Sequence, residues 1–529
     1  MDVENKETPS EYSNSISNLS TTQEGVTAAY EAKSRLINEH MQNEVGFGRY
    51  QIQLFFLTGL GWAADNIWLQ GVAIILPQIQ KELHPVRVEF ATMSLFIGLI
   101  VGASTWGVLA DLIGRKLSFN ITLFICAVFG IAAGGANNFV TLCALISCMG
   151  FGVGGNLPVD GAIFLEVLPR THQWYLTLLS VWWALGQLFA SLIAWPLISN
   201  FSCETADNCP KPDNMGWRYT FYVLGGVTAV MWILRYVVFD LQESAKYLVA
   251  KGRDEDAIKV LEHIAHKNGR TLTLTLESLR AVAKEQRGDA QTIGHLSTYQ
   301  VIRNAFSSFS LSHVTPLFST RRLAINTSIT IVLWGLIGLA YPLFNGFITL
   351  YLTTQVASAP PSTYRTYRDY SIISVLGVPG SVVACLVVDY TRKNPSKFAM
   401  GGRKLTMAIS TALTGIFLFL FTTSKTQEAV LGYSLASGFT QNAMYGVLYA
   451  YTPEVFPAPH RGTGDALCSA FNRICGVLAP VIKIVTTNPD GSAVGGTANG
   501  PIFVSATLFI VASALMLLLP IETAGKAAL

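Results

Sequence analysis

Twelve long, mainly apolar runs restrict the folds that this chain can adopt. A helix needs roughly 20 mostly apolar residues to cross a bilayer, whereas the strands of a membrane barrel have about 10 residues of alternating character. The runs are too long and too continuous for such strands. The sequence therefore predicts an all-α membrane protein with twelve transmembrane helices, at residues 51–76, 90–110, 117–136, 139–165, 173–197, 218–239, 323–350, 371–390, 405–423, 428–451, 464–485 and 501–520.

The amino-acid composition excludes other classes of protein. Hydrophobic residues make up 51% of the 529 residues and charged residues 13%, which is about half the charged share of an average soluble chain. Disordered chains combine low hydrophobicity with high charge, and soluble domains need a more charged surface. The net charge of +3 gives no reason to expect a nucleic acid as partner.

Polar segments divide the chain into parts. Residues 1–50 are rich in Ser, Thr, Asn and Glu and are predicted to be a disordered cytoplasmic tail, and residues 522–529 form a second, short tail. The polar stretch 241–322 holds 12 Lys and Arg residues and is expected to be a partly helical cytoplasmic connector. It separates two predicted six-helix bundles, residues 51–240 and 323–521.

The placement of basic residues predicts the orientation in the membrane, because cytoplasmic loops carry an excess of Lys and Arg. With the N-terminus inside, the short inner loops hold nine such residues and the outer loops seven, and the connector with its 12 lies inside as well. We therefore expect both termini in the cytoplasm. No lipidation or retention motif is visible at the C-terminus, so the plasma membrane is the default location.

Two of the eight cysteines fall in the expected third outer loop, residues 198–217. Cys203 and Cys209 would meet oxidising conditions there and could form a disulfide, and two free thiols are the alternative. Asn200-Phe201-Ser202 is a glycosylation sequon on the same side. Its closeness to the membrane leaves its use open.

Two short elements recur at one spacing. Gly114-Arg115-Lys116 returns as Gly402-Arg403-Lys404, and the sequence EVLP at 166–169 returns as EVFP at 454–457. In both cases the copies are 288 residues apart. A shared spacing indicates that the two six-helix halves are duplicates, a common transporter construction in which the substrate site lies near the membrane midplane between the repeats.

The loop after the second span resembles a known family. Residues 107–116, GVLADLIGRK, are similar to the loop signature of the major facilitator superfamily, with Leu112 where that family often has Arg, and the second copy is broken by an insertion. The stretches 47–51, 59–65, 152–160 and 461–464 resemble fungal members of its synaptic-vesicle-protein-like and organic (aromatic) acid transporter branch, and 243–248 is sugar-porter-like. The resemblance implies the two-bundle fold of that superfamily and secondary transport by alternating access.

Two charged residues lie near the middle of predicted spans, Asp65 in the first and Arg473 in the eleventh. An ionised group at the bilayer centre costs about 2.5–3.5 kcal/mol on insertion scales, so such a group usually has a role or a partner. Arg473 offers a planar, permanently charged fork that suits a carboxylate, and Asp65 can bind and release a proton. The alternative is that the two side chains neutralise each other and only hold the halves together.

Uncharged polar and aromatic residues in the spans are candidates for the walls of a substrate cavity. Polar side chains in spans prefer helix–helix or cavity positions to lipid, whereas Trp and Tyr also populate the membrane interface, so packing or lipid contact is the alternative for each. An aromatic-lined cavity with one fixed cation would suit a flat or apolar carboxylic acid. Besides Arg473, the candidate substrate-binding residues are Asn156, Trp183, Trp334, Gln441, Asn442 and Tyr445.

Charged residues at the inner membrane edge are predicted to act in gating. Acidic residues lie there beside basic ones in both halves, and such charge pairs could latch one state of a bistable interface. Ordinary interfacial charge is the alternative. The predicted gating residues are Gly107, Asp111, Gly114, Arg115, Lys116, Glu166, Asp389, Arg403, Glu454 and Arg461.

Three functions remain open from the sequence. The first is a proton-coupled transporter of an organic anion, the second a facilitator or exporter of a neutral sugar or secondary metabolite, and the third a non-transporting sensor. No phosphate-binding Gly-x4-Gly-Lys-Ser/Thr loop, metal-ligand motif or nucleophile elbow occurs. We therefore expect neither enzyme activity nor a cofactor or metal. The expected state is a monomer in the lipid bilayer, with a small-molecule substrate and a proton as partners.

Overall fold

The computed structural model describes residues 28–113, 115–169, 172, 175–206, 209–238, 241–250, 252–285, 314–356, 360–393, 402–456, 461–488, 494 and 498–522. The chain forms two compact units. The transmembrane unit consists of Phe47–Ser244 and His313–Leu529, and the polar unit consists of Met1–Gly46 and Ala245–Ser312.

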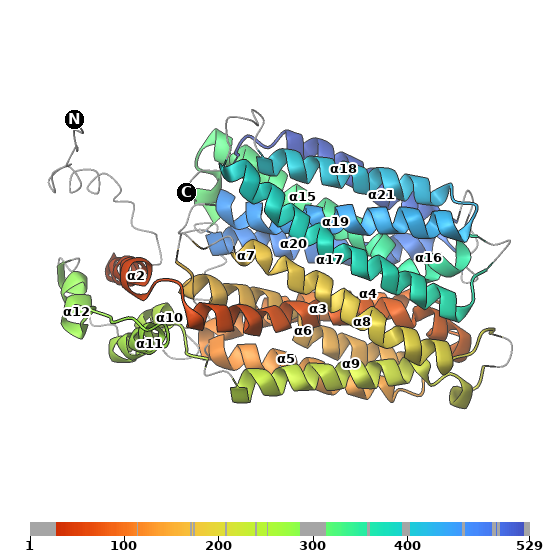
Figure 1. Ribbon diagram of the computed structural model, residues 1–529, viewed down its shortest axis with the longest axis horizontal. Coiled ribbons are helices and arrows are strands. Elements are labelled where there is room, and N and C mark those ends of the chain that lie inside the picture. The colour runs from red at the N-terminus through yellow and green to blue at the C-terminus, as the bar shows by residue number, and fades with distance from the viewer. Residues whose placement is uncertain are drawn as a thin grey trace. The chain divides into compact units, whose positions relative to one another are not determined.

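The described part of the transmembrane unit is helical, and each of the twelve predicted runs falls on a helix or a pair of consecutive helices (Figure 1). The predicted fold class is thereby confirmed. The first half contains α3 (Arg49–Leu83), α4 (Glu89–Ile113), α5 (Arg115–Gly134), α6 (Phe139–Val167), α7 (Tyr175–Leu178), α8 (Ser180–Asn200), η3 (Lys211–Asp213), α9 (Gly216–Ile233) and η4 (Leu234–Val238). The second half contains η5 (Thr315–Phe318), α15 (Arg321–Asn345), α16 (Ile348–Thr354), α17 (Thr363–Lys393), α18 (Gly402–Thr422), α19 (Gln427–Val455), α20 (Arg461–Thr486) and α21 (Gly500–Leu517).

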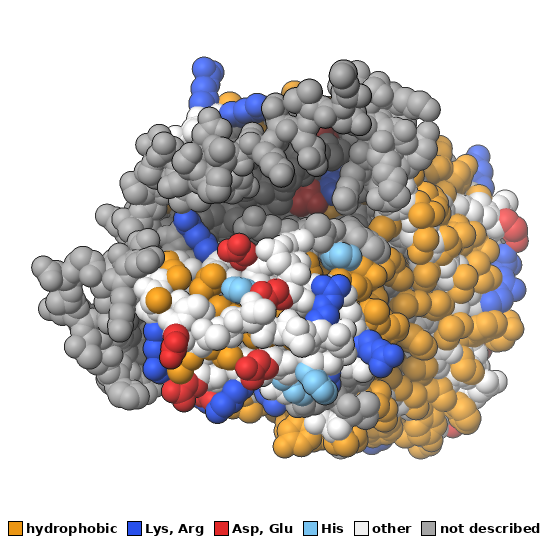
Figure 2. All heavy atoms as spheres, turned by 60° about the vertical axis from the view of Figure 1, so that its left-hand side comes forward, with side chains coloured by type: hydrophobic (Ala, Val, Ile, Leu, Met, Phe, Trp, Pro, Cys, Tyr) orange, Lys and Arg blue, Asp and Glu red, His pale blue; other side chains and the backbone are white. Residues whose placement is uncertain are grey.

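Side chains on the outside of this unit are largely hydrophobic, as the orange surface in Figure 2 shows. Exposed Phe56, Val101, Leu386 and Val485 are examples from four different helices. Such a surface is unfavourable in water and favourable in lipid. Among the described residues, 10 helices are long and apolar enough to cross a membrane by length and composition.

The two long helices that do not reach this hydropathy are α3 and α19. Their polarity has a structural reason, because polar side chains of α3 point into the protein. Asp65, Asn66, Gln70 and Gln78 are at most 1% exposed. Polar groups in a membrane protein are placed between helices, where they find hydrogen-bond partners that lipid lacks. Helix α17 begins at Thr363, before the predicted run 371–390, and its first turns bury the aromatic rings of Tyr367 and Tyr370.

Glycines bring α4 and α6 into backbone contact. A Cβ atom added to Gly98 of α4 would collide with the Ser147 carbonyl oxygen, and one added to Gly154 of α6 would collide with the Leu99 carbonyl oxygen. Small residues at such crossings let the backbones of two membrane helices approach closely. This crossing therefore places the carbonyl groups of both helices at one point.

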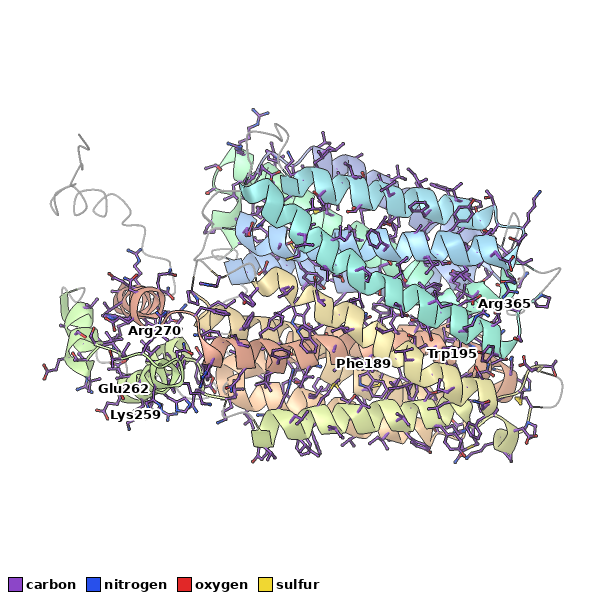
Figure 3. All side chains as sticks on the ribbon, in the orientation of Figure 1. Phe189, Trp195, Lys259, Glu262, Arg270 and Arg365 are labelled. Atoms are coloured by element: carbon purple, nitrogen blue, oxygen red, sulfur yellow. A yellow bond between two sulfur atoms is a disulfide. The ribbon has the colours of Figure 1, made fainter. Side chains whose placement is uncertain are left out.

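The two halves are joined by hydrogen bonds at one end of the unit, which we call the disulfide end because its loops include the Cys203–Cys209 disulfide. In Figure 1, α8 and α17 lie side by side. Trp195 of α8 lies at this end (Figure 3), and its ring centroid is 5.6 Å from that of Tyr364 of α17. The bonds between the halves at this end are Gln70–Tyr341, Gln70–Tyr370, Ala73–Thr349, Ile74–Tyr367, Lys81–Thr363, Arg87–Thr487, Ser191–Ser371 and Glu204–Thr363.

The polar unit corrects the prediction that residues 1–50 are disordered. Residues 28–45 form α2 (Ala28–His40) and η1 (Met41–Val45), beside α10 (Ala245–Ala250), α11 (Asp254–Lys267) and α12 (Leu276–Glu285). The physical reason is an apolar stripe, since Ile37, Met41 and Val45 follow one another at intervals of four and are at most 4% exposed. This spacing forms one face of a helix, although the surrounding composition is polar. Residues 1–27 lie outside the described residues.

Hydrogen bonds also join distant segments of the chain within the polar unit. The backbone N–H of Thr273 donates to the Glu44 carboxylate at 2.7 Å, and its hydroxyl donates to the same group. These bonds lower the pKa of the Glu44 carboxyl. Lys33 of α2 pairs with Asp254 of α11 at 2.5 Å. Figure 3 labels Lys259 and Glu262 on the same helix. The buried stripe and these contacts hold the N-terminal helix on the 245–285 segment.

The close crossing of α4 and α6 predicts that Gly98 does not tolerate a side chain. We expect Gly98→Ala to lower the stability by about 1–3 kcal/mol, because the added methyl group must push two backbones apart. Thermal unfolding of the purified protein in detergent measures the effect. Gly226→Ala is the matched control, since nothing lies within 4 Å of its added Cβ. Equal unfolding temperatures for the two variants would contradict the close crossing.

Candidate functional site

Arg473 of α20 lies buried between the halves, with 7% of its surface exposed. Its Nη1 donates hydrogen bonds to the Gly154 carbonyl oxygen at 2.9 Å and the Leu99 carbonyl oxygen at 3.2 Å. Both acceptors belong to the other half, at the crossing of α4 and α6. The side chain therefore joins the halves in the middle of their spans.

The Gly154 carbonyl is available for a sequence-encoded reason. In a regular helix it would accept the N–H of the residue four positions later, but that residue is Pro158, which has no N–H. A carbonyl freed in this way within a membrane needs another donor. Arg473 supplies that donor from the opposite half, and among the described residues the acceptors of its guanidinium are bound by Nη1 alone. Nη2 and Nε remain to bind an anion in the two-pronged geometry that suits a carboxylate.

Asp65 of α3 is the second charged residue at this level. It is 1% exposed, its Oδ1 has no hydrogen-bond partner, and it lies within electrostatic reach of Arg473 and Asp160 and beside Asn156. Asp65 and Arg473 are both among the described residues, and no ion pair within 4.0 Å joins them. The two opposite charges are thus buried near each other without direct neutralisation.

Five aromatic rings from three helices form what we call the aromatic cluster. The Tyr449 ring has its centroid 5.1 Å from that of Trp62 and 5.1 Å from that of Trp334, and Tyr445 lies 6.0 Å from Tyr449 and 5.3 Å from Tyr341. Trp62 precedes Asp65 by three residues and therefore shares its helix face. Tyr449 lies within electrostatic reach of both Asp65 and Arg473. The cluster therefore borders the two charges.

Hydrogen-bond donors in and beside the cluster are unsatisfied. The Trp62 indole Nε1 and the Gln441 amide nitrogen are buried and have no partner, whereas the Trp334 indole donates to Thr452 at 2.9 Å. Buried donors normally have an acceptor. Two donors without one mark places where a bound ligand can accept a hydrogen bond.

The predicted substrate-binding residues are distributed unevenly around this site. Trp334 and Tyr445 belong to the aromatic cluster, Asn156 lies beside Asp65, and Trp183 lies beside Tyr341. Gln441 accepts from Asn345 at 2.9 Å. Asn442 points elsewhere: its amide donates to the Gly438 carbonyl of its own helix, and it lies against Gly377 of α17. Asn442 is therefore not part of the cluster.

Sequence reasoning did not select Trp62, Tyr341 or Tyr449. The signal that could have identified the first is its position one helical turn before Asp65. Tyr449 follows Tyr445 and Gln441 at intervals of four residues, which places all three on one face of α19. Comparison with the helical phase of Asp65, Gln441 and Tyr445 would therefore have identified Trp62 and Tyr449.

The sequence also did not reveal that Arg235 and Asp160 form an ion pair. Arg235 of η4 and Asp160 of α6 are both fully buried, with 2.6 Å between Nη2 and Oδ2. The Arg235 guanidinium also donates to the Phe119 carbonyl at 2.9 Å and lies 3.6 Å from the centroid of its ring. Gly61 leaves room for both side chains, since an added Cβ would collide with them. The pair adds no net charge to the neighbourhood of Asp65.

The structure describes only part of the predicted gating set. Arg403 and Glu454 form an ion pair between α18 and α19, within the second half. The backbone N–H of Lys116 donates to Glu243 at 3.2 Å, and Glu166 is half-buried on α6. The remaining gating side chains lie outside the described residues, namely those of Gly107, Asp111, Gly114, Arg115, Asp389 and Arg461.

We expect the protein to lose much of its stability when the Asp160–Arg235 pair is broken. Arg235→Gln leaves a buried carboxylate without its cation, which costs about 3–5 kcal/mol. The double variant Arg235→Gln/Asp160→Asn removes both charges and should recover much of that loss. Thermal unfolding in detergent compares the variants with the wild type. A double variant that is no more stable than Arg235→Gln would contradict the importance of this pairing.

The sequence is similar to those of known membrane transporters. The family model described as Major Facilitator Superfamily matches residues 54–402. The chain is 45% identical over 502 residues to the MFS siderochrome iron transporter 1 of Ceriporiopsis subvermispora, covering 94% of this chain and 92% of that protein. It is 27% identical to the niacin transporter NiaP of Acinetobacter baylyi, covering 90% of this chain and 96% of that protein.

A solved structure shares the fold. The xylose transporter XylE from E. coli, in a partially occluded inward-open conformation, superimposes with a TM-score of 0.65 at 17% sequence identity. The similarity covers 90% of this chain and 99% of XylE. It therefore extends over nearly the whole chain.

Proposed function

Because this chain belongs to the Major Facilitator Superfamily and is thus a multi-pass membrane transporter and not an enzyme, we propose that it is a secondary active transporter of small carboxylate-bearing organic anions. The anion moves together with a proton by alternating access. We further propose that the protein acts as a monomer in the plasma membrane, with both termini and the polar unit in the cytoplasm.

The observation that carries this proposal is the buried, unpaired state of Arg473 and Asp65. Removing an ionised side chain from water is expensive unless it is paired and hydrogen-bonded. Within the part of the chain that the structure describes, the hydrogen-bond acceptors of Arg473 are backbone carbonyls, and Asp65 has an oxygen atom without a partner. Intramembrane charges of this kind mark substrate and ion pathways. Arg473 is thus available for a carboxylate and Asp65 for a proton.

The aromatic cluster supports a flat or apolar body for the anion. The Tyr449 ring lies near both charges, and the rings of Trp62 and Trp334 contact it. Aromatic rings favour offset or edge-on contacts with other rings. The niacin transporter similar to this chain is named for a pyridine carboxylic acid, which has a flat aromatic ring and a carboxylate. The relative named for siderochrome iron transport has a different cargo, so nicotinate serves here as a probe of the site.

The hydrogen bonds between the halves support a simple order of events. Hydrogen bonds join the halves at the disulfide end, which supports a state whose site is closed to the outside. In our proposal, an outward-facing state opens this end, the anion binds at Arg473, and Asp65 takes up a proton from the outside. Closure then forms the bonds of Gln70 again, and the other end opens to the cytoplasm. Charged gating residues that face the opposite half at that end would latch the outward-facing state, whereas the Arg403–Glu454 pair would hold α18 and α19 together within the second half.

Replacing Arg473 tests the anion site. We expect Arg473→Gln to reduce nicotinate uptake into proteoliposomes at least ~30-fold, since losing one partner of a buried charge pair costs about 2–5 kcal/mol. Arg473→Lys should retain part of the activity, because it keeps the charge and loses the fork. Arg365→Gln is the control, since Arg365 lies at the disulfide end and pairs with Glu428 (Figure 3). Unchanged uptake by Arg473→Gln would overturn the anion site.

Replacing Asp65 tests the proton coupling. Asn cannot bind or release the proton, so Asp65→Asn should lose accumulation driven by an inward proton gradient. It should retain exchange of labelled against unlabelled nicotinate without a gradient, because Asn resembles the protonated carboxyl group. Asp213→Asn, in η3 outside the spans, is the control for both assays. Gradient-driven accumulation that survives in Asp65→Asn would exclude this residue as the coupling site.

A further inference from the structure

The loop between α8 and α9 reaches across to the second half of the transmembrane unit. Its Glu204 carboxylate accepts hydrogen bonds from the backbone N–H and from the hydroxyl of Thr363, both at 2.9 Å. We propose that Glu204 is a gating residue that latches the disulfide end, and that the Cys203–Cys209 disulfide holds it in position. This inference rests on the alternating access of the proposed function and adds a residue that helps to keep one end closed.

The start of α17 is suited to a carboxylate. The first N–H groups of a helix have no acceptor within that helix. At α17, the Ser362 hydroxyl accepts the N–H of Arg365 at 3.2 Å, and Glu204 accepts the N–H of Thr363, the first residue of the helix. The helix dipole favours a negative charge at this position. Because Glu204 belongs to the first half and α17 to the second, both of its bonds must break when the halves separate at this end.

Glu204 lies inside the short ring that the disulfide closes. Cys203 and Cys209 have a sequence separation of 6, so the ring leaves the backbone at Glu204 few conformations. The base of the loop is closed as well, since the Gly216 N–H donates to the Phe201 carbonyl at 2.7 Å. A segment that is already restrained loses less conformational entropy when its side chain forms bonds. The disulfide therefore favours the contact between Glu204 and α17.

Lys81 of α3 attaches the same loop to the first half. Its Nζ donates to the carbonyl of Cys203, the residue directly before Glu204, at 2.9 Å, and lies 3.5 Å from the Thr363 hydroxyl oxygen. Thr363 is 5% exposed, whereas Glu204 is exposed. Contacts of an exposed carboxylate contribute modestly. We therefore expect a latch that biases the closed state and is weak enough to open in every cycle.

Labelling of a buried position measures the opening of the disulfide end without any transported substrate. The Ser371 hydroxyl of α17 donates to the Ser191 carbonyl of α8 at 3.1 Å, and Ser371 is 2% exposed. A cysteine introduced by Ser371→Cys therefore becomes accessible to a membrane-impermeant maleimide when the halves separate. The reagent is added outside proteoliposomes that contain the full-length protein, and mass spectrometry of the peptide with residue 371 gives the labelling rate.

We expect Glu204→Ala to raise this labelling rate about 3-fold, because the closed state loses its contacts with α17. Glu204→Gln should raise it less, since its amide oxygen can still accept a hydrogen bond. Glu428→Ala is the matched control and should label as the wild type does. Glu428 also bonds to α17, through Arg365 at 2.6 Å, but it belongs to the same half as α17.

The part of the disulfide is tested by Cys203→Ser/Cys209→Ser. This variant should label about as fast as Glu204→Ala, and the combination of both changes should label little faster than either, because they act through one contact. Increases that multiply in the combination would overturn the role of the disulfide in holding Glu204.

Further outcomes decide the latch itself. Equal labelling rates for Glu204→Ala and Glu428→Ala would overturn it, and so would faster labelling of Glu204→Ala that is matched by a lower unfolding temperature in detergent, because general loosening then explains the rate. Absence of labelling of Ser371→Cys in all variants would overturn the opening of this end and with it the proposed alternating access. Failure of nicotinate uptake, with the expected labelling rates, would overturn the proposed substrate and leave the latch in place.

Discussion

The contact between Arg473 and two backbone carbonyls of the opposite half is the interaction around which the rest of the site is arranged. It requires three separate features of the sequence. Gly98 and Gly154 bring α4 and α6 together, Pro158 leaves the Gly154 carbonyl without its helical donor, and Arg473 provides that donor from α20. A guanidinium held in this way keeps a fixed position in the middle of the protein, with donors left over for a ligand.

Around this fixed cation, the protein keeps its net charge low while leaving individual charges unpaired. Asp160 and Arg235 neutralise each other within the first half, whereas Asp65 and Arg473 do not form an ion pair. A direct pair of the latter two would be more stable and less useful, since a ligand would have to break it. In the proposed mechanism, the unpaired arrangement links binding of an anion at Arg473 to binding of a proton at Asp65. Coupling in the proposed mechanism is therefore a consequence of electrostatics in a medium of low dielectric constant.

Much of the fold could be predicted because a bilayer leaves few choices. Long apolar runs predicted the helices, and the scarcity of charge within them singled out Asp65 and Arg473. The aromatic cluster could not be predicted in full, because Trp and Tyr occur in cavities, at helix contacts and at interfaces alike. Helical phase explains the error at Asn442. Gln441, Tyr445 and Tyr449 share one face of α19, and the next residue after Gln441 is turned by about 100°, toward α17.

Two further differences between prediction and structure have similar causes. Asp160 and Arg235 lie toward the ends of their predicted spans, where charges usually face the interface, and only the packing of α3, α6 and η4 shows that they are buried together. The helices of residues 28–45 follow from a stripe of three apolar side chains that average composition conceals. In both cases the deciding information is the contact between segments distant in sequence.

The most direct test of the account is the number of protons taken up when a ligand binds, measured with a pH indicator in weakly buffered solution. For the wild type, we expect uptake of about one proton per nicotinate bound, because the bound anion leaves a charge that a proton on Asp65 compensates. Asp65→Asn should abolish the uptake with nicotinate. Nicotinate binding without proton uptake by the wild type, or the same uptake in Asp65→Asn, would contradict the central claim that Asp65 balances the charge held at Arg473.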